Sequence, residues 1–153
     1  MRTAKQVSVS LVNKPGRLAA VLTALQKEKV ALNALAVMDK GSRGVLRFVP
    51  DDPQAAAAVL DRQNIRFETH DVLLAELHGN NGGLAKACER LAAEHLNIDY
   101  AYVSTAGTKA SKSGCFAVIK VNDLAKAQRL LGEPANGSQR VVKRPGRRPT
   151  YAR

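Results

Sequence analysis

The chain repeats itself at a spacing of 66 residues, and this repeat constrains its fold more than any other feature. A shift of 66 positions superposes a helix face, a turn glycine and the apolar positions of the strand that follows. The aligned pairs are Gly16 with Gly82, Leu18 with Leu84, Leu25 with Leu91, Val30 with Leu96, Leu32 with Ile98, Asn33 with Asp99 and Val37 with Val103. One shift that keeps three kinds of element in register indicates internal duplication.

The first copy shows the residue patterns of strand, helix, two strands, helix and strand. Apolar residues first alternate with serines and then recur at helical spacing, while Asp52 and Pro53 have the residue types that begin a helix. The predicted elements are strand 7–11, helix 16–29, strand 31–38, turn 39–42, strand 45–49, a helix from residue 53 and one extended run over 66–77. Because this run closes the first copy and opens the second with no linker, the copies are expected to share it.

The second copy repeats this order with a longer loop and a weaker ending. Apolar residues at helical spacing predict its first helix, and Asp123 is expected to cap its second. Its other predicted elements are strand 97–104, a basic loop over 105–113, strand 115–121, a helix that stops near Gly132, and residues 140–143 as the one candidate for a short last strand.

This element order predicts an α+β fold. Two helices can cover only one face of a four-stranded antiparallel sheet, so each copy is expected to form a ferredoxin-like βαββαβ unit with its helices on one face. We expect a first domain over residues 1–70, a second over 71–139, and a basic, disordered tail over 140–153. From Arg140 onward the chain has six basic and no acidic residues, so more than half of its net charge of +11 lies there.

The first strand–helix turn carries a motif of a known family. Asn13-Lys14-Pro15-Gly16-Arg17-Leu18 resembles the signature of the ACT domain, in which an Asp or Asn, a Pro-Gly pair and a Leu join the first strand to the first helix. Two segments of the second copy strengthen the match, Gly82-Gly83-Leu84-Ala85 and Leu96-Asn97-Ile98-Asp99. The resemblance covers about residues 5–131 and is greatest to stand-alone tandem ACT proteins with no attached enzyme.

This resemblance implies a regulatory, non-enzymatic protein that binds a small amino acid between adjacent ACT units and signals to a partner enzyme or regulator. It further implies that the protein forms a homodimer and uses no cofactor. The ligand carboxylate would bind amides at a helix start, where glycine allows close approach of the main chain. The ligand ammonium would bind an oxygen of Asn13, Asn33 or Asp99. The implied ligand-binding residues are Asn13, Lys14, Pro15, Gly16, Arg17, Leu18, Asn33, Asn80, Asn81, Gly82, Gly83, Leu84 and Asp99.

The two turns depart from the family pattern in different ways. The second has Gly79 where the pattern has Asp or Asn, and Asn81 where it has Pro. The first copy has Asn33 in place of an acid, whereas the second keeps Asp99. The two sites are therefore expected to differ in affinity.

Nucleic-acid binding is the alternative function. An RNA-recognition module has the same strand–helix order, and residues 43–49 resemble its third-strand motif. That motif needs aromatic side chains to stack bases, and Val45 and Arg47 occupy the stacking positions here. We therefore expect nucleic acid to bind, if at all, through the basic tail by counterion release.

Catalysis and metal binding have little support in the sequence. No phosphate loop or HExxH motif occurs, and no nucleophile, base and orienting acid converge. Cys88 and Cys115 have no CxxC or helical His neighbour, and the three histidines lie in different segments. The N-terminal residues are too polar for a signal peptide or a membrane span, so we expect a cytoplasmic protein.

Overall fold

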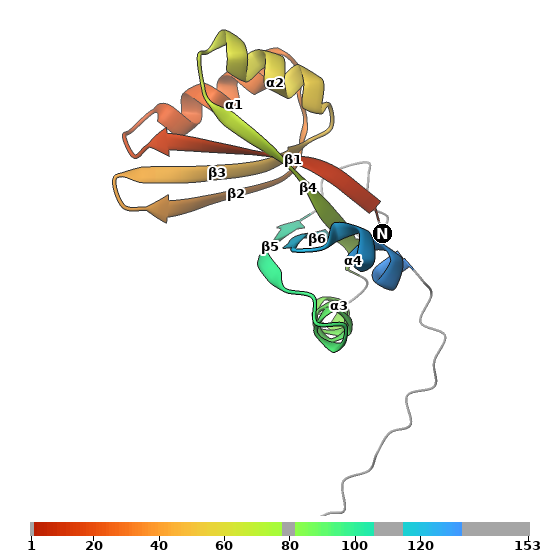
Figure 1. The fold of residues 1–153 in the computed structure, drawn as a ribbon. Helices are drawn as coiled ribbons and strands as arrows, with labels where there is room; N and C mark the ends of the chain where they lie inside the picture. The colour runs from red at the N-terminus through yellow and green to blue at the C-terminus, as the bar shows by residue number, and fades with distance from the viewer. Residues whose placement is uncertain (1, 78–81, 106–114, 133–153) are drawn as a thin grey trace, which may run out of the picture.

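A computed structural model of the chain describes residues 2–77, 82–105 and 115–132. Its elements are β1 (Arg2–Val12), α1 (Arg17–Lys27), β2 (Leu32–Lys40), β3 (Arg43–Pro50), α2 (Pro53–Arg62), β4 (Phe67–Glu76), α3 (Gly82–Ala93), β5 (Ile98–Thr105), β6 (Cys115–Val121) and α4 (Leu124–Gly132). The strands form one antiparallel sheet in the order β2-β3-β1-β4-β6-β5 (Figure 1). The predicted order of elements is confirmed, and the last predicted strand, 140–143, lies outside the described residues.

Strand β4 joins the two halves of the sheet. Its residues Phe67–Leu74 pair with β1, and Leu73–Glu76 pair with β6, so one strand crosses from the first half to the second (Figure 1). The predicted first strand, 7–11, was too short. Residues Arg2–Ala4 extend β1 because they pair with Val72–Leu74, on the side of β4 opposite β6.

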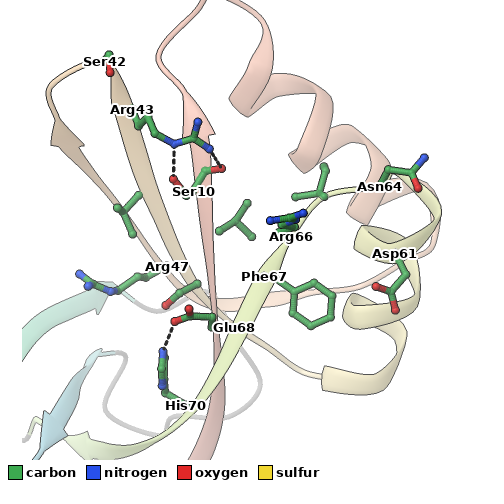
Figure 2. Close-up of a pocket in the computed structure, with 14 residues that line it drawn as sticks. Ser10, Ser42, Arg43, Arg47, Asp61, Asn64, Arg66, Phe67, Glu68 and His70 are labelled. Carbon is green, nitrogen blue, oxygen red and sulfur yellow. Dashed lines mark hydrogen bonds and ion pairs between the residues drawn. The ribbon is translucent and has the colours of Figure 1, made fainter.

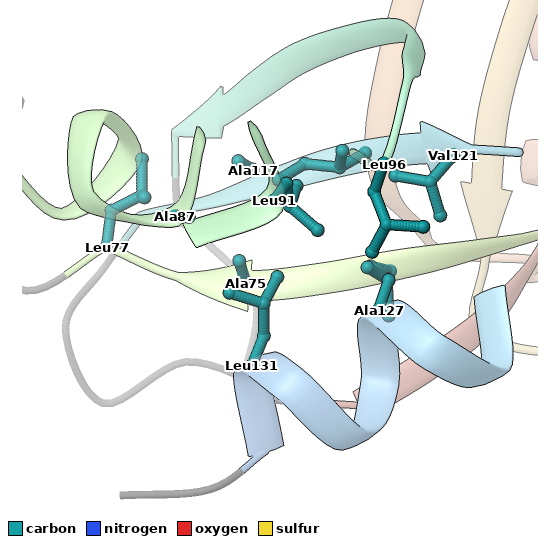
Figure 3. Packing of buried hydrophobic residues seen from close by; sticks show 11 residues of the cluster. Ala75, Leu77, Ala87, Leu91, Leu96, Ala117, Val121, Ala127 and Leu131 are labelled. Atoms are coloured by element: carbon teal, nitrogen blue, oxygen red, sulfur yellow. The ribbon is translucent and has the colours of Figure 1, made fainter. Parts of the chain in front are cut away.

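All four helices cover the same face of this sheet. Helices α1 and α2 pack on a core that includes Val7, Val9 and Phe48, and α3 and α4 pack on a second core around Leu73 and Ile119. Figure 3 shows Leu131 of α4 beside Ala75 of β4, and Ala127 of α4 beside Leu96. Aliphatic side chains fill most of both cores, as a chain with 4% aromatic residues requires.

The backbone repeats as faithfully as the sequence does. Lys29 and His95, 66 positions apart, both end a helix in the left-handed conformation, with φ of 57° and 54°. The amides that follow them, of Val30 and Leu96, donate back to Leu25 and Leu91 at 3.0 and 2.9 Å. These bonds form Schellman motifs, which satisfy the last carbonyls of each helix.

The opposite, helix-free face is curled on itself. The edge strands β2 and β5 contact each other, and the Ser104 hydroxyl donates to the Asn33 carbonyl at 2.8 Å. Between them lies a third apolar cluster, Ala34, Val49, Val72, Leu74, Phe116 and Val118. Part of the face that an RNA-recognition module would leave open for bases is therefore buried here.

Candidate functional site

The turn between β1 and α1 lies on the surface of the first half. Asn13, Lys14, Pro15, Gly16 and Arg17 are all exposed, and Leu18 packs partly on the core beneath α1. The Asn13 amide donates to the Ser42 carbonyl at 3.1 Å, which fastens the turn to the β2–β3 hairpin. Gly16 has a φ of 85°, a left-handed value that disfavours side chains other than glycine.

Helix α1 begins without a side-chain cap. No side chain accepts from its first amides, and the described residues supply no backbone acceptor for the amides of Leu18 and Ala19. In α2, by contrast, the Asp52 carboxylate accepts from the amides of Gln54 and Ala55, both at 3.0 Å. The start of α1 thus offers a carboxylate the kind of donors that Asp52 already uses.

The structure separates Asn33 from this turn. Val12 pairs with Arg43 and Leu32 pairs with Pro50, so the end of β1 and the start of β2 lie at opposite ends of β3. Seven residues of extended strand span about 23 Å. Asn13 and Asn33 of one chain therefore cannot contact the same small amino acid.

Asn33 and Asp99 occupy equivalent places in the two halves. Each lies at a register shift near the start of an edge strand, between Leu32 and Ala34 in β2 and between Ile98 and Tyr100 in β5. Asp99 is exposed, and its carboxylate accepts from the Asn97 side chain at 3.5 Å. The correspondence of the bulges agrees with the sequence repeat.

The second predicted turn is described only in part. Asn80 and Asn81 lie outside the described residues. Gly82 and Gly83 begin α3, and Leu84 packs partly against the second core.

The helix-free face holds a polar cluster that the sequence analysis missed. Gln6 is fully buried, its amide donates to the Tyr100 hydroxyl at 2.6 Å, and its carbonyl accepts from the Tyr102 hydroxyl at 2.9 Å. The Arg47 guanidinium lies 4.0 Å from the centre of the Tyr100 ring. The sequence did contain a signal for this cluster. Tyr100 and Tyr102 alternate along one strand, and Gln6 and Ser8 alternate along another.

Burial makes the Tyr102 hydroxyl a poor acid. Desolvation raises the pKa of Tyr102 well above its ordinary value of 10.0, the neighbouring Tyr100 raises it further, and the Arg47 charge lowers it in part. Tyr102 therefore stays neutral and can donate to Gln6 over the whole physiological range.

Beside this cluster runs a groove of about 1070 Å³ (Figure 2). It is lined by β1, β3, the end of α2 and the segment that leads into and begins β4, and its basic side chains are Arg43, Arg47, Arg66 and His70. Its carboxylates are Asp61 and Glu68, and Glu68 lies 3.4 Å from His70.

The part of the chain that the structure describes holds no group of three or more His, Cys, Asp or Glu side chains that could bind a metal ion. None of its helices is long and apolar enough to cross a membrane.

Comparison with known proteins gives the family. The model of the ACT domain pair matches residues 2–130. Among solved structures, the protein BT0572 from Bacteroides thetaiotaomicron is 32% identical with a TM-score of 0.75, covering 85% of this chain and 87% of that one. The ligand-free regulatory subunit of aspartate kinase from Thermus thermophilus is 20% identical with a TM-score of 0.57, covering 85% and 88% of the two chains.

A third structure, of aspartokinase α and β subunits, is 18% identical with a TM-score of 0.53, covering 86% of this chain and 95% of that one. No curated protein sequence matches the chain. The family match spans both halves of the sheet and all four helices. This chain therefore belongs to the family of ACT domain pairs.

Proposed function

We propose that the protein is a non-enzymatic regulator that binds a small amino acid at the start of α1. The bound ligand would change how the protein associates with a partner enzyme or regulator. The family assignment supports this role, and so does the fold shared with regulatory subunits of aspartate kinase.

The uncapped start of α1 is the observation that carries the proposal. A carboxylate at the amides of Leu18 and Ala19 would replace the missing cap and interact favourably with the helix dipole. Lys14 and Arg17 are exposed beside it and add positive charge. In this arrangement the ligand carboxylate accepts from the first amides of α1, as the Asp52 carboxylate accepts from the first amides of α2.

The ligand ammonium needs an oxygen from elsewhere. Asn13 lies in the same turn, whereas Asn33 of the same chain is at the far end of β3. We therefore place the ligand between two ACT units, with Asn33 or Asp99 supplied by a second copy of the chain. This arrangement requires a homodimer.

A thermal-shift screen of the twenty amino acids tests the proposal. A ligand at a hundred times its dissociation constant should stabilise the protein by about 2.7 kcal/mol. The variant Gly16→Val should lose this stabilisation. A Cβ at Gly16 would meet no atom within 4 Å, so the substitution acts through the backbone at φ 85° rather than by a clash.

The matched control is Lys29→Val, which places valine in the left-handed region at the other end of the same helix. It should lower the melting temperature and keep the ligand response. No response to any amino acid at millimolar concentration would contradict amino-acid sensing. An unchanged response in Gly16→Val would move the site away from α1.

A further inference from the structure

The groove that opens on the helix-free face is lined by arginines that have no carboxylate partner in the described part of the chain. We name it the arginine groove, after Arg43, Arg47 and Arg66, which line it together with Ser8, Ser10 and His70 (Figure 2). Within the described residues, none of the three arginines forms an ion pair. Asp61 and Glu68 are its two acidic residues, so the three arginines exceed them by one charge.

Arg47 is the least satisfied of these groups. It is partly buried on β3, and its Nε is buried with no hydrogen-bond partner among the residues that the structure describes. Its other contacts are the Tyr100 ring, at 4.0 Å, and the Met38 sulfur, which accepts from a terminal nitrogen at 3.5 Å. Both are weak partners for a guanidinium with five donors. A partly desolvated cation without an anion is costly, and a bound anion would remove that cost.

Arg43 is held in place yet keeps free donors. Its Nε donates to the Ser10 hydroxyl at 2.8 Å, and one terminal nitrogen donates to the Ser10 carbonyl at 3.3 Å (Figure 2). Since stacking fixes Arg47 and hydrogen bonds fix Arg43, binding an anion would cost little side-chain entropy.

The strand register brings these groups to one face. Ser8 lies opposite both Arg47 on β3 and Glu68 on β4, and Ser10 lies opposite Val45. Arg43 and Arg47 are four residues apart on one strand, or about 13 Å, and alternate side chains share a face. Donors from β1 and β3 therefore face the groove, with the Glu68 carboxylate of β4 beside them.

From these observations we propose that the arginine groove binds a small molecule that carries a phosphate group. Phosphate offers several acceptor oxygens and a double negative charge, which a guanidinium group binds well, and Ser8 and Ser10 add hydroxyl donors. This site opens on the helix-free face beside the end of α2 and shares no lining residue with the amino-acid site at α1. Because Arg47 stacks on Tyr100 of β5, a ligand here would contact the junction of the two halves.

Tyrosine fluorescence provides a direct readout. The chain has no tryptophan and three tyrosines, and Tyr100 lies directly under Arg47. A Tyr151→Phe background leaves emission from Tyr100 and Tyr102 alone. In the full chain, inorganic phosphate and glycerol phosphate should each change this emission in a saturable way, and sodium chloride at equal ionic strength should not.

Variants identify the site. Arg47→Gln should weaken phosphate binding about tenfold or more, because charge-assisted hydrogen bonds are lost. Arg66 is exposed just before β4, so Arg66→Gln should weaken binding as well, and it keeps the test decisive if the Arg47 variant fails to fold. Arg129→Gln is the control, since Arg129 is exposed on α4 and does not line the groove.

Three outcomes would overturn the proposal. The first is a fluorescence change that follows ionic strength and does not saturate. The second is wild-type affinity in both Arg47→Gln and Arg66→Gln. The third is binding of single-stranded RNA, lost in Arg47→Gln, with no binding of either small phosphate, since this would make the groove a nucleic-acid contact.

Discussion

At the scale of single residues, Gly16 and Gln6 show how position decides the role of a side chain. Gly16 precedes α1 in the left-handed region, and the described residues offer no acceptor to the amides of Leu18 and Ala19. Gln6 lies in the alternating pattern of β1, where a polar residue is expected to face water. The curled sheet buries it instead, and two tyrosines satisfy its amide group.

The bond from Tyr102 to Gln6 predicts a pH-dependent stability. Tyr102→Phe should lower the free energy of unfolding at neutral pH by about 1–3 kcal/mol, because the buried Gln6 carbonyl loses its donor. The raised pKa of Tyr102 means that the folded state favours the neutral form, so its stabilising effect is complete below pH 10.0 and is lost above it.

Denaturant unfolding at several alkaline pH values checks this expectation. The difference in stability between wild type and Tyr102→Phe should shrink as the pH rises above 10.0. A difference that stays constant through that range would show that Tyr102 is not held neutral by the fold.

At the scale of elements, the second helix of each half begins with the same kind of cap. Asp52 caps α2, and Asp123 caps α4 by accepting from the Lys126 amide at 2.9 Å. In each half, the residue before the cap also bonds to the segment that leads into the second strand. The Asp51 carboxylate accepts from the Ala31 amide at 2.9 Å, and the Asn122 side chain accepts from the Asn97 amide at 3.0 Å. The caps were predictable because an N-cap depends on local sequence.

Removal of the α2 cap measures what a carboxylate contributes at a helix start in this fold. Asp52→Ala should reduce the free energy of unfolding by about 1 kcal/mol, since the amides of Gln54 and Ala55 lose their acceptor. Asp52→Asn retains an acceptor oxygen and should stay close to wild type. Equal losses in the two variants, measured by denaturant unfolding, would show that the cap hydrogen bonds do not stabilise α2.

The sequence predicted what local pattern controls and missed what depends on distant contacts. Helix faces, strand order and the shared run over 66–77 follow from periodicity and the repeat, and the structure confirms them. The curl of the sheet depends on contact between β2 and β5, about 70 residues apart in the chain. Arg47 was considered only as a base-stacking position, because nothing local indicates that Tyr100 lies beneath it.

At the scale of the whole molecule, one sheet carries two kinds of candidate site. The helices lie on one face and leave the open start of α1 at one end, while the curled face holds the polar cluster and the arginine groove. The cluster joins β1 and β3 of the first half to β5 of the second. A ligand bound in the arginine groove would therefore contact side chains that join the two halves.

The measurement that most directly tests the central claim is backbone amide NMR of the full chain, titrated with the amino acid that gives the largest thermal shift. Binding at the start of α1 predicts saturable shifts of the Leu18 and Ala19 amides, with smaller changes at Asn13 and none at the capped amides of Gln54 and Ala55. Unchanged Leu18 and Ala19 amides under saturating ligand would contradict the assignment of the amino-acid site to α1.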